Sequence, residues 1–117
     1  MTLTTDQLLA FAARSGNVAL IRERVLLGGD PTRSGALLAA IAHGHAQAVQ
    51  ILLELGADPN ARDADGHGAL EYALRNGNAP LVHLLVSHGA TLALHSRQHW
   101  RLQLQEVLAE TERGTTA

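Results

Sequence analysis

From Gly44 to Leu70 the chain reads GHAQAVQILLELGADPNARDADGHGAL, a helix pattern followed by a polar loop. A glycine break opens this stretch, the apolar helix pattern ends at Leu55-Gly56, and a glycine turn closes the loop. Asp63-Ala64-Asp65-Gly66 has the composition of a type I turn, with Asp at the first position and Gly at the fourth. The stretch therefore predicts a helix followed by a projecting turn.

The same pattern recurs on both sides of this stretch. Gly44 and Gly77 lie 33 residues apart, and Gly56 and Gly89 keep the same offset. Towards the N-terminus the offset is 28, as between Gly16 and Gly44, because the loop after Asp30 is five residues shorter. A period near 33 residues, with two short helices and a turn in each copy, predicts a stacked solenoid.

The middle copy resembles the ankyrin repeat. The family's G-H, L-L-L, G-A-D-x-N-A and D-x-x-G motifs match Gly44-His45, Ile51-Leu52-Leu53, residues 56–61 and residues 63–66. The resemblance covers about residues 4–95, although only the Leu of the family's T-P-L-H motif remains, as Leu9, Leu37 and Leu70. It implies an all-α fold, an ankyrin-type α-solenoid of stacked antiparallel helix pairs with one full-length β-turn finger.

We expect a single domain over residues 1–110, with repeats at about 4–33, 34–63 and 64–95. A capping helix at about 96–110 should follow, with Ser96 as its N-cap, and residues 111–117 should form a flexible tail. The apolar residues of this helix are spaced for one face that covers the third repeat: Trp100, Leu104, Val107 and Leu108. The alternative is a partner-binding helix anchored by Trp100.

Local signals place the helices of the first repeat. Thr4 and Gln7 form a capping-box pattern, with Leu3 and Leu8 spaced for the accompanying hydrophobic staple, so the first helix should begin at Thr5. The second helix carries charged residues, Glu23-Arg24, where the other repeats have apolar ones. A terminal repeat needs a polar outer face, which explains these charges; the alternative is a charged binding site at residues 22–24.

Composition limits the possible functions. Apolar residues make up 46% of the chain and aromatic residues 3%, which suits closely packed short helices. The net charge of −2 argues against a nucleic-acid partner, and the absence of cysteine excludes disulfides and thiolate sites. We expect no signal peptide, no membrane segment and a cytoplasmic location. All basic residues are arginine, which hints at a bacterial source.

Chemical motifs are scarce. His95 and His99 are spaced to share a helix face, but no third metal ligand stands at a characteristic distance, so metal binding remains only an alternative. No catalytic or phosphate-binding motif is present, and we expect neither an enzyme nor a cofactor. We expect Glu71 to form hydrogen bonds near a helix start.

The resemblance implies a concave binding face built from the finger and the first helix of each pair. The residues at these positions, hereafter the concave face, are Arg14, Arg33, His43, Arg62, Ala64, Asp65, His67, Arg75 and Asn76. Their mixed charges favour a polar surface on one protein partner, and the protein should be a monomer when unbound.

Three other roles stay open at this point. The protein could be an antidote or inhibitor that occludes a toxin or an enzyme, a histidine-based metal-binding protein, or a fragment of a longer ankyrin array. The charges of Glu23-Arg24 and the Trp100 helix argue against the fragment, because both ends have the features of caps.

Overall fold

The computed structural model describes the backbone of residues 4–32, 35–92 and 94–115, and the side chains of these residues except 94–96 and 110–115. Seven helices span this described part of the chain. They are α1 (Thr5–Ser15), α2 (Val18–Leu26), α3 (Ala36–Ala42), α4 (Ala46–Glu54), α5 (Ala69–Arg75), α6 (Ala79–Ser87) and α7 (Leu94–Thr115).

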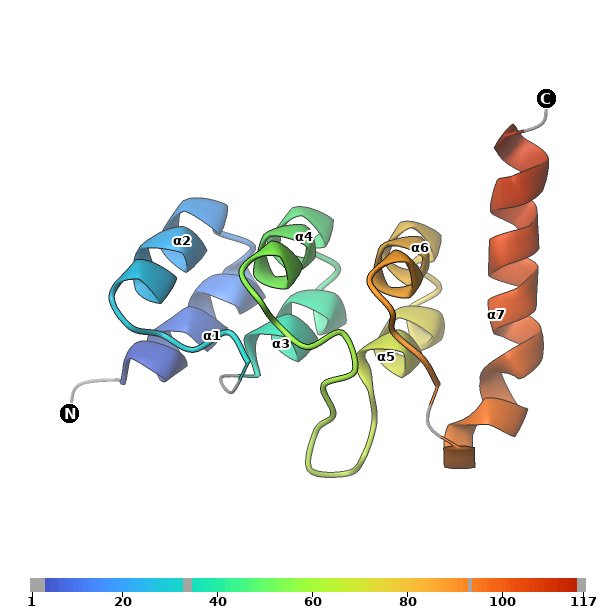
Figure 1. The fold of residues 1–117 in the computed structure, drawn as a ribbon, viewed down its shortest axis with the longest axis horizontal. Coiled ribbons are helices and arrows are strands. Elements are labelled where there is room, and N and C mark those ends of the chain that lie inside the picture. Colours follow the sequence, from blue (N-terminus) through green and yellow to red (C-terminus); the bar gives the residue numbers. More distant parts are fainter. Residues whose placement is uncertain (1–3, 33–34, 93, 116–117) are drawn as a thin grey trace.

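The first six helices form three antiparallel pairs that stack side by side (Figure 1). The first helices of the pairs, α1, α3 and α5, contact one another in one row, and the second helices, α2, α4 and α6, form a parallel row above them. The molecule is elongated, with extents of 49 × 33 × 19 Å. The prediction of an all-α solenoid of helix pairs is confirmed.

Columns of equivalent residues fill the space between the pairs. Leu9, Leu37 and Leu70 occupy one position in successive first helices, and all three are buried. Small side chains beside them, such as Ala40 and Ala73, allow neighbouring helices to approach closely. The repeat offsets in the sequence therefore become layers of the hydrophobic core.

Helix ends follow local capping signals. Thr4 accepts a hydrogen bond from the Gln7 N–H at 3.1 Å, while the Gln7 side chain accepts from the Thr4 N–H at 2.8 Å, so the predicted capping box is formed. Asn17 and Asn78 cap α2 and α6, each by accepting one backbone N–H with its side-chain oxygen. Leu3, the other half of the predicted staple, lies outside the described residues.

Side chains also connect neighbouring repeats. The His45 ring donates from Nε2 to the Arg14 carbonyl oxygen at 2.9 Å and lies against Gly16, where a Cβ atom would come within 2.7 Å of the ring. Gly16 also has a φ of 72°, which favours glycine, so both the backbone conformation and the nearby His45 ring disfavour a larger residue there. Asn60 accepts from the Thr91 N–H at 2.8 Å and joins the loops after α4 and α6.

Helix α7 stands at the C-terminal end of the stack and contacts both α5 and α6 (Figure 1). Trp100, Leu104 and Val107 are partly buried against the core, as their spacing predicts. Two boundaries differ from the sequence prediction. The helix begins at Leu94, so Ser96 lies within its first turn and is not the N-cap, and helical backbone continues to Thr115, past the expected end at Glu110.

Candidate protein-interaction surface

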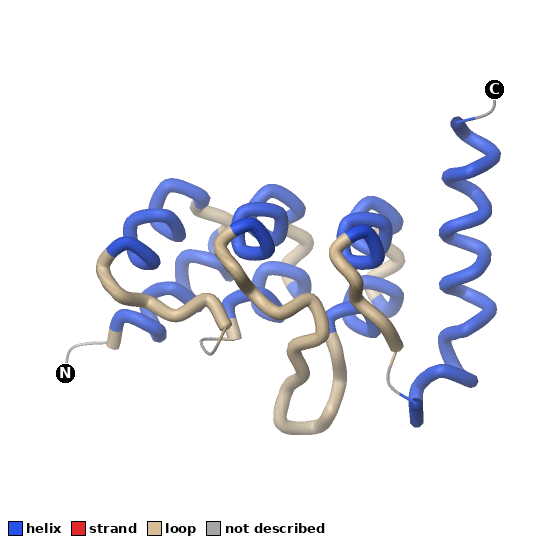
Figure 2. The backbone as a smooth tube through the Cα atoms, in the orientation of Figure 1, coloured by secondary structure: helices blue, strands red, loops and turns tan. Residues whose placement is uncertain are grey.

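The loop between α4 and α5 forms the finger, defined here as residues 61–68. It projects from the stack on the side of the first helices (Figure 2). Its two sides are joined by an antiparallel bridge between Arg62 and Gly68. The Gly66 N–H donates to the Asp63 carbonyl oxygen at 3.0 Å, which closes the turn as its sequence predicts.

The Asp63 carboxylate organises the interior of the finger. Its Oδ1 accepts from the Asp65 and His67 N–H groups, both at 2.9 Å, and its Oδ2 accepts from the Tyr72 hydroxyl. These donors favour the ionised carboxylate, so they lower the pKa of Asp63, with the Tyr72 bond as the largest cause. The same bond raises the pKa of Tyr72.

A second carboxylate attaches the finger to α5. Glu71 is only 2% exposed, and its side chain accepts from the His67 ring at 3.2 Å and from the Gly68 N–H at 3.5 Å. Gly68 precedes the first residue of α5, so this is the predicted hydrogen bond of Glu71 near a helix start. The finger is therefore fixed to the stack by polar contacts with Glu71 and Tyr72.

Charged and exposed side chains lie on the finger and on α5 next to it. The Arg75 guanidinium carbon lies 5.6 Å from the centre of the Tyr72 ring, a cation–π distance that orients this side chain beside the finger. Arg62, Ala64 and Asp65 are exposed on the finger itself. One local surface thus combines a fixed turn, two arginines and one acid.

A family model for ankyrin repeats matches three copies over residues 8–95. The chain is an ankyrin-repeat protein. Such repeats are generally protein–protein interaction modules. Within the described helices, none is both long enough and apolar enough to cross a lipid bilayer.

Similar proteins include an ankyrin-repeat protein with a SOCS box. Ankyrin repeat and SOCS box protein 14 of Mus musculus is 37% identical over 94 residues, covering 78% of this chain and 16% of that protein. Dynein axonemal heavy chain 12 of Bos taurus is 38% identical over 94 residues, covering 78% of this chain and 26% of that protein. An ankyrin repeat-containing protein of Treponema pallidum (strain Nichols) is 30% identical over 95 residues, covering 76% of this chain and 32% of that protein. This ankyrin-repeat chain therefore spans a third or less of each of these relatives.

The concave-face residues of this ankyrin-repeat protein fall into separate groups. Arg62, Ala64, Asp65 and His67 lie on the finger, and Arg75 lies on α5 against the Tyr72 ring. Helix α3 lies between them and α1, which carries the exposed Arg14 (Figure 1).

Three further members of the concave face have different surroundings. His43 is exposed at the end of α3 and stacks on His45 with ring centres 6.4 Å apart. Asn76 is exposed, but its amide donates to the Ile41 carbonyl oxygen at 3.3 Å and so joins the second and third repeats. Arg33 lies outside the described residues.

Sequence reasoning missed two aromatic residues on the first helices. Phe11 is 54% exposed on α1, and Tyr72, at the same repeat position on α5, is half-buried. Ala39 takes this position on α3, so the two rings lie on either side of a small residue. The chain has one Phe and one Tyr, and their common register in the repeats was the signal that could have identified them.

The histidines do not assemble a metal site within the described side chains, where no group of three or more possible ligands is close enough to hold an ion. His99 is exposed and packs edge-on against Trp100, with ring centres 4.6 Å apart. The side chain of His95 lies outside the described part, so the proposed pair of His95 and His99 stays a prediction.

Proposed function

We propose that this ankyrin-repeat protein binds one protein partner through its concave face, with the finger and the adjacent end of α5 as the centre of contact. The observation that supports this proposal is the Asp63 network. It holds the finger by three hydrogen bonds to one carboxylate, while Arg62, Ala64 and Asp65 remain exposed. A surface that is ordered before binding loses less conformational entropy when the partner arrives.

The charges of the concave face favour an acidic partner surface. Arg14, Arg62 and Arg75 are exposed there, against the single acid Asp65, although the chain as a whole has a net charge of −2. Complementary charges increase association rate and specificity more than they increase affinity. We therefore infer a partner patch that contains carboxylates, with hydrogen-bonding groups for Asp65.

The size of a stable interface shows how much of the concave face has to take part. A stable interface uses about 800 Å² from each protein. The surface of this chain is 6974 Å², so one such interface would cover about a ninth of it. The finger has only eight residues, whereas such an interface uses roughly 20–30 residues of each protein, so the ends of the first helices would supply the remainder.

A matched pair of variants tests the proposal. The double variant Arg62→Ala, Asp65→Ala removes one positive and one negative charge from the finger and leaves the Asp63 network intact. The control Arg22→Ala, Glu23→Ala removes the same charges from exposed positions on α2. Capture from a lysate of the source organism identifies the partner, and calorimetry with that purified partner measures affinity after circular dichroism has shown that both variants are folded.

We expect the finger variant to bind about tenfold or more weakly, since central interface residues account for most of the binding energy. The control should bind as the parent does. If the finger variant keeps the parent affinity for the captured protein while the control loses it, the contact lies on the second helices and the concave-face proposal is wrong.

A further inference from the structure

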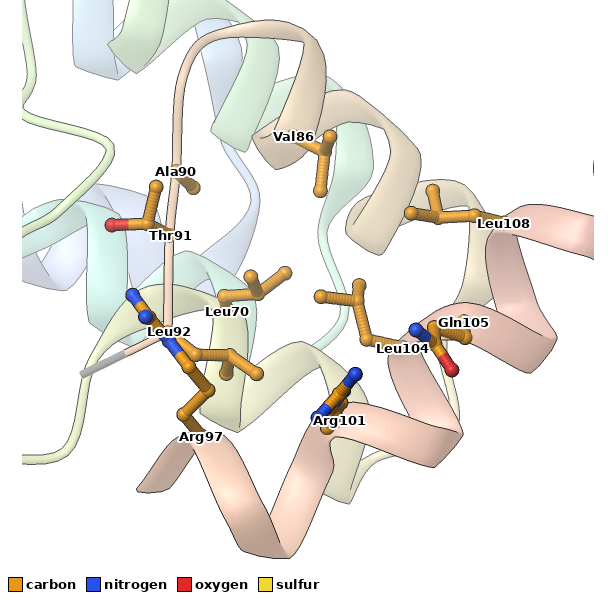
Figure 3. Close-up of a pocket in the computed structure, with 10 residues that line it drawn as sticks. All are labelled: Leu70, Val86, Ala90, Thr91, Leu92, Arg97, Arg101, Leu104, Gln105 and Leu108. Carbon is orange, nitrogen blue, oxygen red and sulfur yellow. The ribbon is translucent and has the colours of Figure 1, made fainter. Parts of the chain in front are cut away.

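An open pocket of about 300 Å³ lies between α7 and the third repeat (Figure 3). Apolar side chains from α5, α6, the loop after α6 and α7 form most of its wall: Leu70, Val86, Ala90, Leu92, Leu104 and Leu108. The volume is at the lower end of the range for small-molecule pockets, roughly 300–1,000 Å³. None of the lining residues belongs to the concave face.

Two arginines stand at the rim of this apolar pocket. Arg97 and Arg101 both come from α7, and Figure 3 shows their side chains extending from that helix toward the pocket, with Arg97 beside Leu92. Both residues are exposed. The other polar lining residues, Thr91 and Gln105, are uncharged, so the described lining of the pocket contains no carboxylate.

No described side chain neutralises the two positive charges. Arg97 and Arg101 are four residues apart on one helix, a spacing at which like charges face each other and repel. Among the side chains that the structure describes, neither arginine forms an ion pair. An anion between the two guanidinium groups would remove this repulsion.

We propose that the pocket binds an aliphatic carboxylate of medium chain length. The alkyl chain would lie against the leucines and Val86, where burial of each methylene is favourable. The carboxylate would accept hydrogen bonds from Arg97 and Arg101, whose planar guanidinium groups match its geometry. The pairing of an apolar interior with a cationic rim fits this class of ligand better than it fits a neutral lipid or a cation.

The single tryptophan provides the readout. Trp100 lies on α7 next to Arg101 in the sequence and is partly buried against the core, so a ligand that settles beneath α7 should change its fluorescence. The full chain is titrated with decanoate below its micelle concentration, and calorimetry supplies the stoichiometry. We expect saturable binding of one decanoate per chain.

Substitutions of the two rim arginines test whether decanoate binds at this pocket. Arg97→Gln, Arg101→Gln should bind decanoate about tenfold or more weakly, because charge-assisted hydrogen bonds are lost while the apolar wall is kept. Arg101→Gln alone should show a smaller loss, and the matched control Arg22→Gln, on α2, should bind as the parent does. Circular dichroism shows whether each variant is folded.

Three results would overturn the proposal. Decanol, which has the same chain without the charge, would bind as tightly as decanoate if the pocket were only an apolar gap under α7. Unchanged decanoate affinity in the folded double variant would place the ligand elsewhere, and the absence of saturable decanoate binding would show that the pocket takes no such ligand.

Discussion

The junctions between repeats and the junction between the third repeat and α7 are built differently. Between repeats, columns such as Leu9, Leu37 and Leu70 are buried, and side chains from one repeat bond to the backbone of the preceding repeat. At α7, the contact residues are only partly buried, and two pockets of about 300 and 190 Å³ lie beside the helix. Stacked repeats thus share one close-packed core, whereas α7 covers its end and leaves room for a ligand.

The largest expected effect comes from a leucine between repeats. Leu52 on α4 is fully buried, and α4 contacts both α2 and α6. Leu52→Ala should lower the free energy of unfolding by about 2–5 kcal/mol, because it removes buried methyl groups and leaves a cavity in the stack. Urea denaturation followed by circular dichroism measures the loss.

The same change at α7 should cost less. Leu104 is only partly buried and already borders the larger pocket, so Leu104→Ala should lower the free energy of unfolding by roughly 1–2 kcal/mol. The same urea experiment compares the two variants, and Trp100 fluorescence reports α7 separately. An equal loss for Leu52→Ala and Leu104→Ala would mean that α7 is packed as closely as the repeats are.

A hydrogen bond from a side chain to the backbone of a neighbouring repeat should contribute less to the free energy of unfolding than either leucine. His45→Ala removes the donor to the Arg14 carbonyl oxygen and should lower the free energy of unfolding by about 0.5–1.5 kcal/mol. His88→Ala, at an exposed histidine, is the control and should change it by less than about 0.5 kcal/mol. Comparable losses in the two variants would show that the bond between the first and second repeats adds nothing to stability.

The repeats and their local features were predictable from sequence because their signals are local. The capping box at Thr4 and the turn at Asp63 each depend on residues within a few positions of one another. The offsets of 28 and 33 residues then gave the register of the stack. Spacing along α7 likewise identified Trp100, Leu104 and Val107 as its contact residues.

Contacts between elements were not predictable in this way. Tyr72 bonds to Asp63 across nine positions, and Asn76 bonds to Ile41 across 35, in a geometry that only the packed helices create. The start of α7 at Leu94 was missed because Ser96 gave a plausible but incorrect cap signal. The pocket beside Arg101 lies between α7 and the third repeat, so it depends on how α7 packs against α5 and α6.

The junction between the finger and α5 is of a third kind, because mainly polar groups hold it. Tyr72→Phe removes the hydroxyl that donates to Asp63 and keeps the ring beside Arg75. That hydroxyl is the largest cause of the lowered pKa of Asp63, so in the variant this pKa should rise toward its ordinary value of 3.8. A carbon-detected NMR titration of the Asp63 carboxyl group measures the shift.

The stability change should be the smallest of the four, because solvent screens the partly exposed Asp63 carboxylate, and it should depend on pH. A lowered pKa in the folded state means that ionised Asp63 stabilises the fold above the unfolded pKa, and that this contribution is lost as pH falls through the folded pKa. The unfolding free energies of the parent and Tyr72→Phe should therefore differ slightly at neutral pH and converge in acid. If the two curves coincided through this range, the Tyr72 hydroxyl would add nothing to stability, and Tyr72 would act through its ring alone.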